Sequence, residues 1–97
     1  MKTYISLCNY TAKGVENIKD SPARLDQVKK LYASMGAKLK DFYLVTGAYD
    51  IVVIVEAPDD ETMAKATMAV GARGSVRTNT FRAFTEAEYR KLIGALP

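Results

Sequence analysis

The segment Asp50–Ala57 constrains the fold of this chain more than any other part of its sequence. Positions 51–55 read Ile-Val-Val-Ile-Val, so five apolar residues follow one another without a break. Successive side chains of a β-strand point to opposite faces of a sheet, so a strand here presents apolar groups on both faces. We therefore expect a sheet whose two faces are both covered at this strand.

Periodic patterns divide the rest of the chain into three further strands and three helices. The strands show alternation of side chains, whereas the helices show apolar residues at spacings of three and four. Ser21 and Pro22 suit the start of the first helix, with Ser21 as its cap, and Gly36 ends it. Strands are expected at 2–10, 38–46, 50–57 and 75–84, and helices at 21–35, 59–70 and 86–96, with 11–20 as a loop that holds a short helical turn.

The order strand, helix, strand, strand, helix, strand, helix predicts a ferredoxin-like βαββαβ fold with an extra C-terminal helix. Right-handed crossovers place the first and third strands in the middle of a four-stranded antiparallel sheet. Lys38 and Lys40 suit an edge strand, because charge discourages unwanted strand pairing. The expected fold class is therefore α+β, with residues 1–97 forming a single domain.

The two helices between the strands can cover only one face of this sheet. The other face requires a second cover, because leaving its apolar side chains in water forgoes about 1.5–3 kcal/mol for each of them. The terminal helix is one candidate cover, but its apolar stripe, Tyr89, Leu92, Ile93 and Leu96, is narrow for four strands. We therefore expect a homodimer in which two sheets pack face to face.

The composition excludes several classes of site. The chain has no histidine and one cysteine, Cys8, so neither a metal site nor a haem or other cofactor is expected. The net charge is +3, but the 14 basic residues are scattered, and nucleic-acid binding requires a concentrated basic face. No segment resembles a signal peptide or a membrane-spanning helix, so we expect a cytoplasmic protein that contacts no membrane.

Several short blocks of sequence resemble the GYD domain family, which is named for a Gly-x-Tyr-Asp motif. The motif itself is at Gly47–Asp50, and further similar blocks are at 9–14, 19–24, 56–61 and 75–78. The resemblance runs over nearly the whole chain. It implies a dimeric α/β-barrel fold, shared with small cofactor-independent monooxygenases, muconolactone isomerases and the ligand-sensing domain of Lrp-type regulators. It supplies no catalytic residues.

Five residues are candidates for a ligand site. Tyr4 and Cys8 belong to one face of the first strand, which carries hydroxyl, thiol and phenol groups, as the wall of a small-molecule cavity does. Tyr43 and either Arg77 or the pair Thr78 and Thr80 would complete the cavity, and Arg77 would favour an anionic ligand. The alternative is that these side chains pack in an interface.

The fifth candidate is Asp50, at the end of the turn before the central strand. It could accept a hydrogen bond from a ligand, but an aspartate at this place also commonly caps the amides of a turn.

These features predict a small dimeric ligand-binding or sensory domain for an anionic or aromatic molecule, without catalysis of its own. One alternative is a cofactor-independent isomerase or monooxygenase in which Tyr43, Asp50 or Arg77 polarises the substrate. A second alternative is a structural assembly protein whose dimers stack further. The only expected macromolecular partner is a further copy of the chain.

Overall fold

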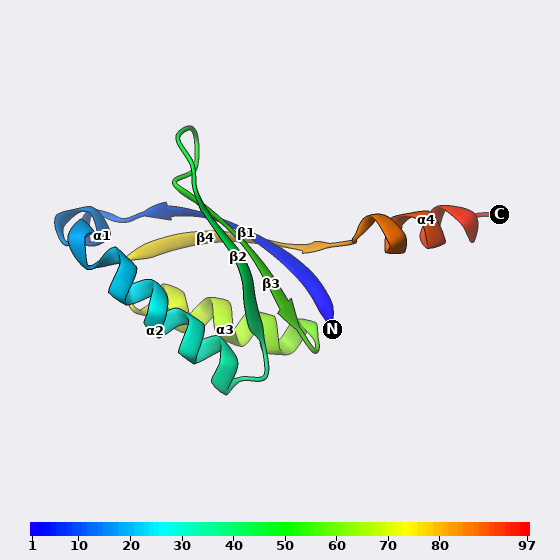
Figure 1. Cartoon of the computed structure of the whole chain (residues 1–97), viewed down its shortest axis with the longest axis horizontal. Helices are drawn as coiled ribbons and strands as arrows, with labels where there is room; N and C mark the ends of the chain where they lie inside the picture. Colours follow the sequence, from blue (N-terminus) through cyan, green and yellow to red (C-terminus); the bar gives the residue numbers. More distant parts are fainter.

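The computed structural model describes residues 1–97 as one antiparallel sheet, two long helices beneath it and a short helix at each end (Figure 1). No helix is both long and apolar enough to cross a membrane. The elements in chain order are β1 (Lys2–Tyr10), α1 (Ala12–Glu16), the 3-10 helix η1 (Ile18–Asp20), α2 (Ser21–Ser34), β2 (Lys38–Leu44), β3 (Ile51–Ala57), α3 (Asp60–Ala72), β4 (Val76–Ala83) and α4 (Glu86–Gly94).

The sheet has the strand order β2-β3-β1-β4, and each neighbouring pair is antiparallel. The first and third strands are therefore central, which confirms the ferredoxin-like arrangement predicted from the order of elements. Tyr4 pairs with Val55 and Cys8 pairs with Ile51, so these side chains share one face of the sheet. This face is the one that α2 and α3 cover.

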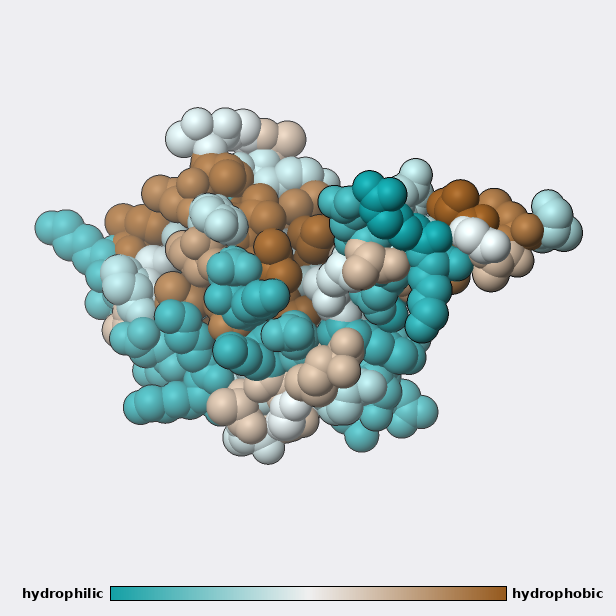
Figure 2. Space-filling view, turned by 45° about the vertical axis from the view of Figure 1, so that its right-hand side comes forward, coloured by the Kyte–Doolittle hydropathy of each residue, from teal (hydrophilic) through white to brown (hydrophobic).

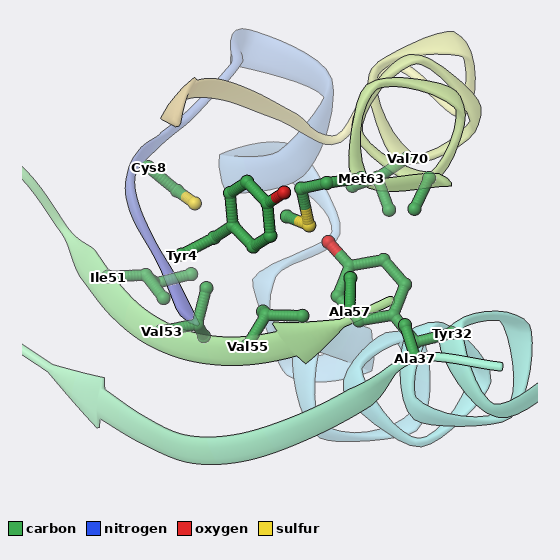
Figure 3. Close-up of a cluster of buried hydrophobic side chains, with 11 residues drawn as sticks. Tyr4, Cys8, Tyr32, Ala37, Ile51, Val53, Val55, Ala57, Met63 and Val70 are labelled. Carbon is green, nitrogen blue, oxygen red and sulfur yellow. The ribbon is translucent and has the colours of Figure 1, made fainter. Parts of the chain in front are cut away.

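The core lies between that face and the two helices (Figure 3). β3 shows a strict alternation of buried and half-buried residues, in which the odd-numbered positions point toward the helices. α3 contributes Met63, Ala66 and Val70 from the side that faces the sheet. The buried apolar residues are Tyr4, Cys8, Tyr32, Ala37, Ile51, Val53, Val55, Ala57, Met63, Ala66 and Val70.

The two long helices begin in different ways. Asp59 caps α3, because its carboxylate oxygen accepts a hydrogen bond from the Thr62 amide at 2.7 Å. Its negative charge is also favourable at the positive end of the helix dipole. α2, by contrast, has Asp20 as its N-cap, one residue before the expected cap, and no side-chain capping bond. The expectation that Ser21 caps α2 is wrong, because the Ser21 hydroxyl instead shares a 2.8 Å hydrogen bond with the Tyr10 hydroxyl.

A β-bulge in β2 changes which of its side chains face the helices. The register shifts between Leu39 and Asp41, so that Leu39 and Phe42 both lie on the covered face. Without the bulge, regular alternation would place Leu39 and Tyr43 on the same face. The extra residue puts Tyr43 on the other face, opposite Val52.

No helix of the chain covers the second face of the sheet. α4 follows β4 outward and lies beyond the edge of the body instead of folding back over the strands (Figure 1). Phe81 and Tyr43 are more than half exposed on this uncovered face. We call it the open sheet face, and it comprises Ile5, Leu7, Asn9, Asp41, Tyr43, Val52, Ile54, Arg77, Asn79 and Phe81.

Candidate functional site

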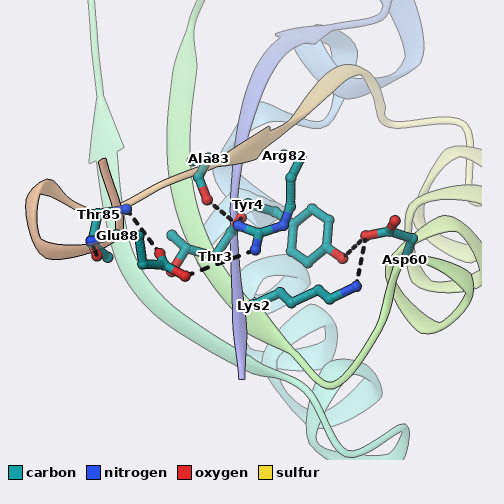
Figure 4. Close-up of polar contacts among 8 residues, drawn as sticks. All are labelled: Lys2, Thr3, Tyr4, Asp60, Arg82, Ala83, Thr85 and Glu88. Carbon is teal, nitrogen blue, oxygen red and sulfur yellow. Dashed lines mark hydrogen bonds and ion pairs between the residues drawn. The ribbon is translucent and has the colours of Figure 1, made fainter. Parts of the chain in front are cut away.

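Two of the five expected site residues, Tyr4 and Cys8, lie on the covered face of β1 and are buried (Figure 3). The Tyr4 hydroxyl donates a hydrogen bond to the Asp60 carboxylate at the start of α3 (Figure 4). Burial and this hydrogen bond raise the pKa of Tyr4 to about 12. Burial likewise raises the pKa of the Cys8 thiol to about 11, so Cys8 is a neutral wall group at neutral pH and not a reactive thiolate.

Tyr43 and Arg77 lie on the opposite side of the sheet from Tyr4 and Cys8. Tyr43 pairs with Val52, and Arg77 pairs with Asn9, which places both side chains on the open sheet face. These two residues therefore share no cavity with Cys8. Tyr4 does not line the same cavity as Cys8 either, because it borders a separate pocket beside Asp60 and Met63 of α3. They are positioned to touch whatever covers the open sheet face.

Asp50 lies at the end of the sheet, where the β2–β3 connection re-enters it. Its carboxylate accepts a hydrogen bond from the Tyr10 amide at 2.9 Å, and its own amide donates to the Cys8 carbonyl at 2.9 Å. Its carbonyl accepts from the Val45 amide at 2.8 Å. Asp50 thus extends the backbone pairing of β1, β2 and β3 past the last regular pair. These contacts favour a structural role for Asp50 over a ligand-binding one.

A cavity of about 710 Å³ lies between the covered face of the sheet and the segment formed by α1, η1 and α2. We call it the sheet–helix cavity. Its floor is largely apolar, with Cys8 from β1 beside Ile51 and Val53 from β3. The chain brings Cys8 together here with Thr78 of β4, one of the pair Thr78 and Thr80 that was the alternative to Arg77, whereas Thr80 does not line this cavity. Other apolar lining residues are Leu25, Val28, Tyr32, Leu39, Phe42, Val70 and Val76.

Polar groups are few inside this cavity. Ser6 is 2% exposed and shares a 2.8 Å hydrogen bond with Thr80, so its hydroxyl is already satisfied. The paired hydroxyls of Tyr10 and Ser21 join β1 to α2 at the wall. Tyr32 is buried, and its burial raises the pKa of its phenol to about 12. The interior therefore presents neutral hydroxyl and thiol groups on an apolar surface.

Positive charge gathers where the cavity opens. Lys13, Arg24 and Arg73 are lining residues, whereas Asp20 is the single acidic one, and we call the three cations the cationic rim. The Arg24 guanidinium is held in place by the carbonyls of Asn17 at 2.8 Å and Gly14 at 3.2 Å. An anionic group at this opening would meet a net positive field.

The backbone beside the rim is tightly interlocked. The Lys13 ammonium donates to the Arg73 carbonyl at 3.0 Å, which ties α1 to the end of α3. The Thr11 amide donates to the Ser75 carbonyl at 3.1 Å, and the Thr11 hydroxyl donates to the Gly74 carbonyl at 2.5 Å. We call these contacts the α1 clasp, and they set the spacing between two of the three rim cations.

Sequence reasoning missed the cationic rim because its members come from three separate segments. Lys13 is in α1, Arg24 in α2 and Arg73 follows α3, so no spacing in the sequence relates them. The resemblance to a known family had pointed to the blocks at 9–14 and 19–24, which flank this end of the cavity. No group of three or more His, Cys, Asp or Glu side chains lies close enough together to hold a metal ion.

Comparison with known families gives a match over most of the chain. The family model described as the GYD domain matches residues 4–93. A curated relative from Thermus thermophilus is 37% identical over 89 residues, which are 91% of this chain and 94% of that protein. That relative is named glutamine synthetase and cystathionine beta-lyase binding protein.

Solved structures of the same fold include proteins from other organisms. The feast or famine regulatory protein from M. tuberculosis, in complex with L-methionine, matches with a TM-score of 0.66 at 15% identity over 88% of this chain. This chain spans about half of that protein, 51% of its length. A protein from Thermus thermophilus matches with a TM-score of 0.57 at 24% identity, over 88% of this chain and 95% of that one.

Proposed function

The chain belongs to the GYD domain family, and we propose that it is a ligand-binding module whose site is the sheet–helix cavity. The observation that carries this proposal is the cavity of about 710 Å³, with an apolar floor and a cationic rim. Sites for small molecules are commonly about 300–1,000 Å³, largely apolar and provided with a few polar anchors. In this proposal residues 1–97 act as one domain.

The ligand class follows from the distribution of charge and polarity. An apolar or aromatic body would lie on the floor near Cys8 and Ile51, where burial of its surface drives binding. An anionic head, such as a carboxylate, would lie at the cationic rim, where Arg73 and Lys13 can donate to it. The regulatory protein that shares this fold was solved with L-methionine, an amino acid, which supports a sensory role for such a domain.

A thermal-shift and calorimetric panel tests the ligand class. Phenylpropanoate, phenylbutanoate and their neutral alcohols would be compared, with the carboxylates expected to bind at least threefold more tightly. Arg73→Gln should weaken carboxylate binding about three- to tenfold, since it removes a charge-assisted donor from the rim. Lys30→Gln is the matched control, because it removes an exposed cation of α2 that does not line the cavity. Equal binding of acids and alcohols, or equal losses in both variants, would contradict the proposed site.

The module is proposed to be a homodimer joined through its open sheet faces. Val52 and Ile54 of β3 are only half-buried there, and covering the rest of each side chain would gain part of the roughly 1.5–3 kcal/mol that complete burial is worth. Ile54→Lys should give monomers in sedimentation velocity, because it would bury an unpaired charge in the dimer but not in a lone chain. A wild-type protein that sediments as a monomer at 100 µM would contradict the pairing.

A second candidate function is binding of another protein. The relative that is 37% identical carries a name that describes it as a binding protein for glutamine synthetase and cystathionine beta-lyase. Surface plasmon resonance of this chain against each of those two enzymes, with and without a cavity ligand, tests this role. A response that depends on the ligand would join the two functions, whereas no response to either enzyme would leave the ligand-binding proposal alone.

The alternative of a cofactor-independent isomerase or monooxygenase gains little support from the cavity wall. Such chemistry needs a group that can exchange a proton near neutral pH. The Cys8 thiol has a pKa of about 11 and the Tyr32 phenol a pKa of about 12. Both groups are therefore weak acids that stay protonated at that pH.

A further inference from the structure

The C-terminal helix α4 carries an apolar stripe that its own chain leaves more than half exposed. None of its residues is buried. Figures 1 and 2 show the helix projecting from the body with apolar side chains gathered on it. The stripe consists of Tyr89, Leu92, Ile93 and Leu96, which are 56%, 51%, 51% and 65% exposed.

The chain holds α4 in this outward direction by specific contacts (Figure 4). Thr85 and Glu88 form a complete capping box, with hydrogen bonds of 2.9 Å and 3.2 Å between side chain and backbone. Arg82 of β4 lies 3.9 Å from the Glu88 carboxylate and stacks on Phe84, 4.4 Å from the ring centroid. These contacts link the edge strand, the connection and the first turn of α4 into one unit.

A projecting helix of this length requires an apolar surface for its stripe. Isolated helices shorter than about 12–15 residues are marginal in water, and α4 has nine residues. The chain is also more extended than a compact domain, since its radius of gyration is 14.6 Å, against about 12.5 Å expected for this length. α4 therefore lacks the contact that would stabilise it.

We propose that the α4 stripe packs on a second copy of this chain, at the open sheet face and its margin. A four-stranded sheet about seven residues long has a footprint of about 450 Å², from the strand spacing and the rise per residue. A standard interface covers about 800 Å² on each partner. The flat footprint of the sheet is smaller than this accessible area, and two reciprocally placed α4 helices would enlarge the interface. This inference extends the sheet pairing proposed above.

The charges of α4 favour a second copy over a membrane surface. Helices that lie on membranes carry an excess of lysine and arginine beside their apolar face. α4 has Glu86 and Glu88 against Arg90 and Lys91, so its charges cancel, and Arg90 pairs with Glu86 at 2.8 Å within the helix. A helix that is neutral overall, next to an apolar sheet on the same chain, fits a contact between copies.

Sedimentation equilibrium of two double variants tests the inference. Leu92→Gln/Ile93→Gln removes the middle of the stripe and should raise the dimer dissociation constant at least tenfold. Ala87→Gln/Lys91→Gln is the matched control, because both positions lie on the opposite side of the helix at 100° per residue, and it should change the constant less than twofold. Equal dissociation constants in the two variants would overturn the role of α4 while leaving sheet pairing intact. Loss of association in Ile54→Lys reports on the sheet pairing separately.

Cysteine cross-linking between differently tagged chains locates the contact. In a Cys8→Ala background, Leu92→Cys on one chain and Phe81→Cys or Tyr43→Cys on the other place thiols on the stripe and on either edge of the open sheet face. A mixed covalent dimer with at least one of these partners is the expected result. Overturning results would be no mixed dimer with either partner, or a disulfide that forms only within a chain carrying both Leu92→Cys and Phe81→Cys.

Discussion

Gly14 lies directly against the carbonyl oxygen of Ser75, so that a Cβ atom at position 14 would be 2.1 Å from that oxygen. The backbone of α1 can approach the connection before β4 this closely only without a side chain. The same two segments supply Lys13 and Arg73 to the cationic rim. The clasp at Gly14 therefore positions one end of the proposed binding site.

Replacement of Gly14 by alanine should lower the free energy of unfolding by about 1–3 kcal/mol, because the added methyl group forces α1 and Ser75 apart. Urea unfolding followed by circular dichroism measures the loss. Gly47→Ala is the matched control, since nothing lies within 4 Å of a Cβ there. Equal stabilities of the two variants would contradict the close approach at Gly14.

Thr67 and Thr80 should respond in opposite directions to replacement by valine. The Thr67 hydroxyl is buried without a hydrogen-bond partner, so Thr67→Val should raise the free energy of unfolding by about 1 kcal/mol. The Thr80 hydroxyl bonds to Ser6, which is buried, so Thr80→Val should lower it by about 1–3 kcal/mol. Urea titrations of the two variants under identical conditions provide the comparison, and a change of the same sign in both would count against it.

Stability should fall in alkaline solution because of Tyr32. Burial raises its pKa from 10.0 to about 12, so the folded protein keeps this phenol neutral while the unfolded chain ionises. The contribution is fully present below pH 10 and is lost as the pH rises toward 12, with a total of about 2–3 kcal/mol at 1.36 kcal/mol per pKa unit. Urea unfolding between pH 8 and 11.5 measures this.

Tyr32→Phe is the control for that titration, because it removes the ionisable group and keeps the ring. Its stability should decline less steeply above pH 10 than that of the wild type. Cys8 and Tyr4, with pKa values raised to about 11 and about 12, contribute declines of their own that both proteins share. Parallel profiles of wild type and Tyr32→Phe would show that Tyr32 is not protected as described.

The capping box of α4 can be tested locally. Thr85→Ala removes the side-chain acceptor of the Glu88 amide and should cost the helix about 1 kcal/mol, which is about a fivefold faster hydrogen exchange in α4. Because α4 buries no residue within its chain, exchange in β1 and β3 should stay unchanged. Thr46→Ala, in the exposed turn before β3, serves as the comparison. Uniform acceleration throughout the protein would contradict an independent α4.

Much of the fold could be predicted because its signals are local. β1 spans Lys2–Tyr10 as alternation indicated, and the capping box at Thr85 starts α4 where the sequence placed it. The apolar run at positions 51–55 identified β3 as a strand with apolar side chains on both faces. Segment 11–20 was harder, because most of it forms α1 and η1, and the start of α1 is held by a contact with the distant residue Ser75.

The candidate site was predicted less well, because it depends on which face of the sheet each strand residue occupies and on contacts between distant segments. A single extra residue near Lys40 reverses the side on which Tyr43 lies, and nothing in a lone sequence announces a bulge. Arg77 was one position out of phase with Thr78, which does line the cavity. Composition could supply the residue types of a ligand site, but only the register decides which face they occupy.

In each of the two central strands, neighbouring residues face opposite sides of the sheet. Along β1, Cys8 borders the cavity while its neighbour Leu7 belongs to the open sheet face, and Ile51 and Val52 divide β3 in the same way. A ligand that enters the cavity and shifts these strands would therefore also shift the open sheet face. The displacement would pass through a single peptide unit and would need no intervening side chains. Ligand binding on one face of the sheet and pairing of copies on the other would thus be coupled directly.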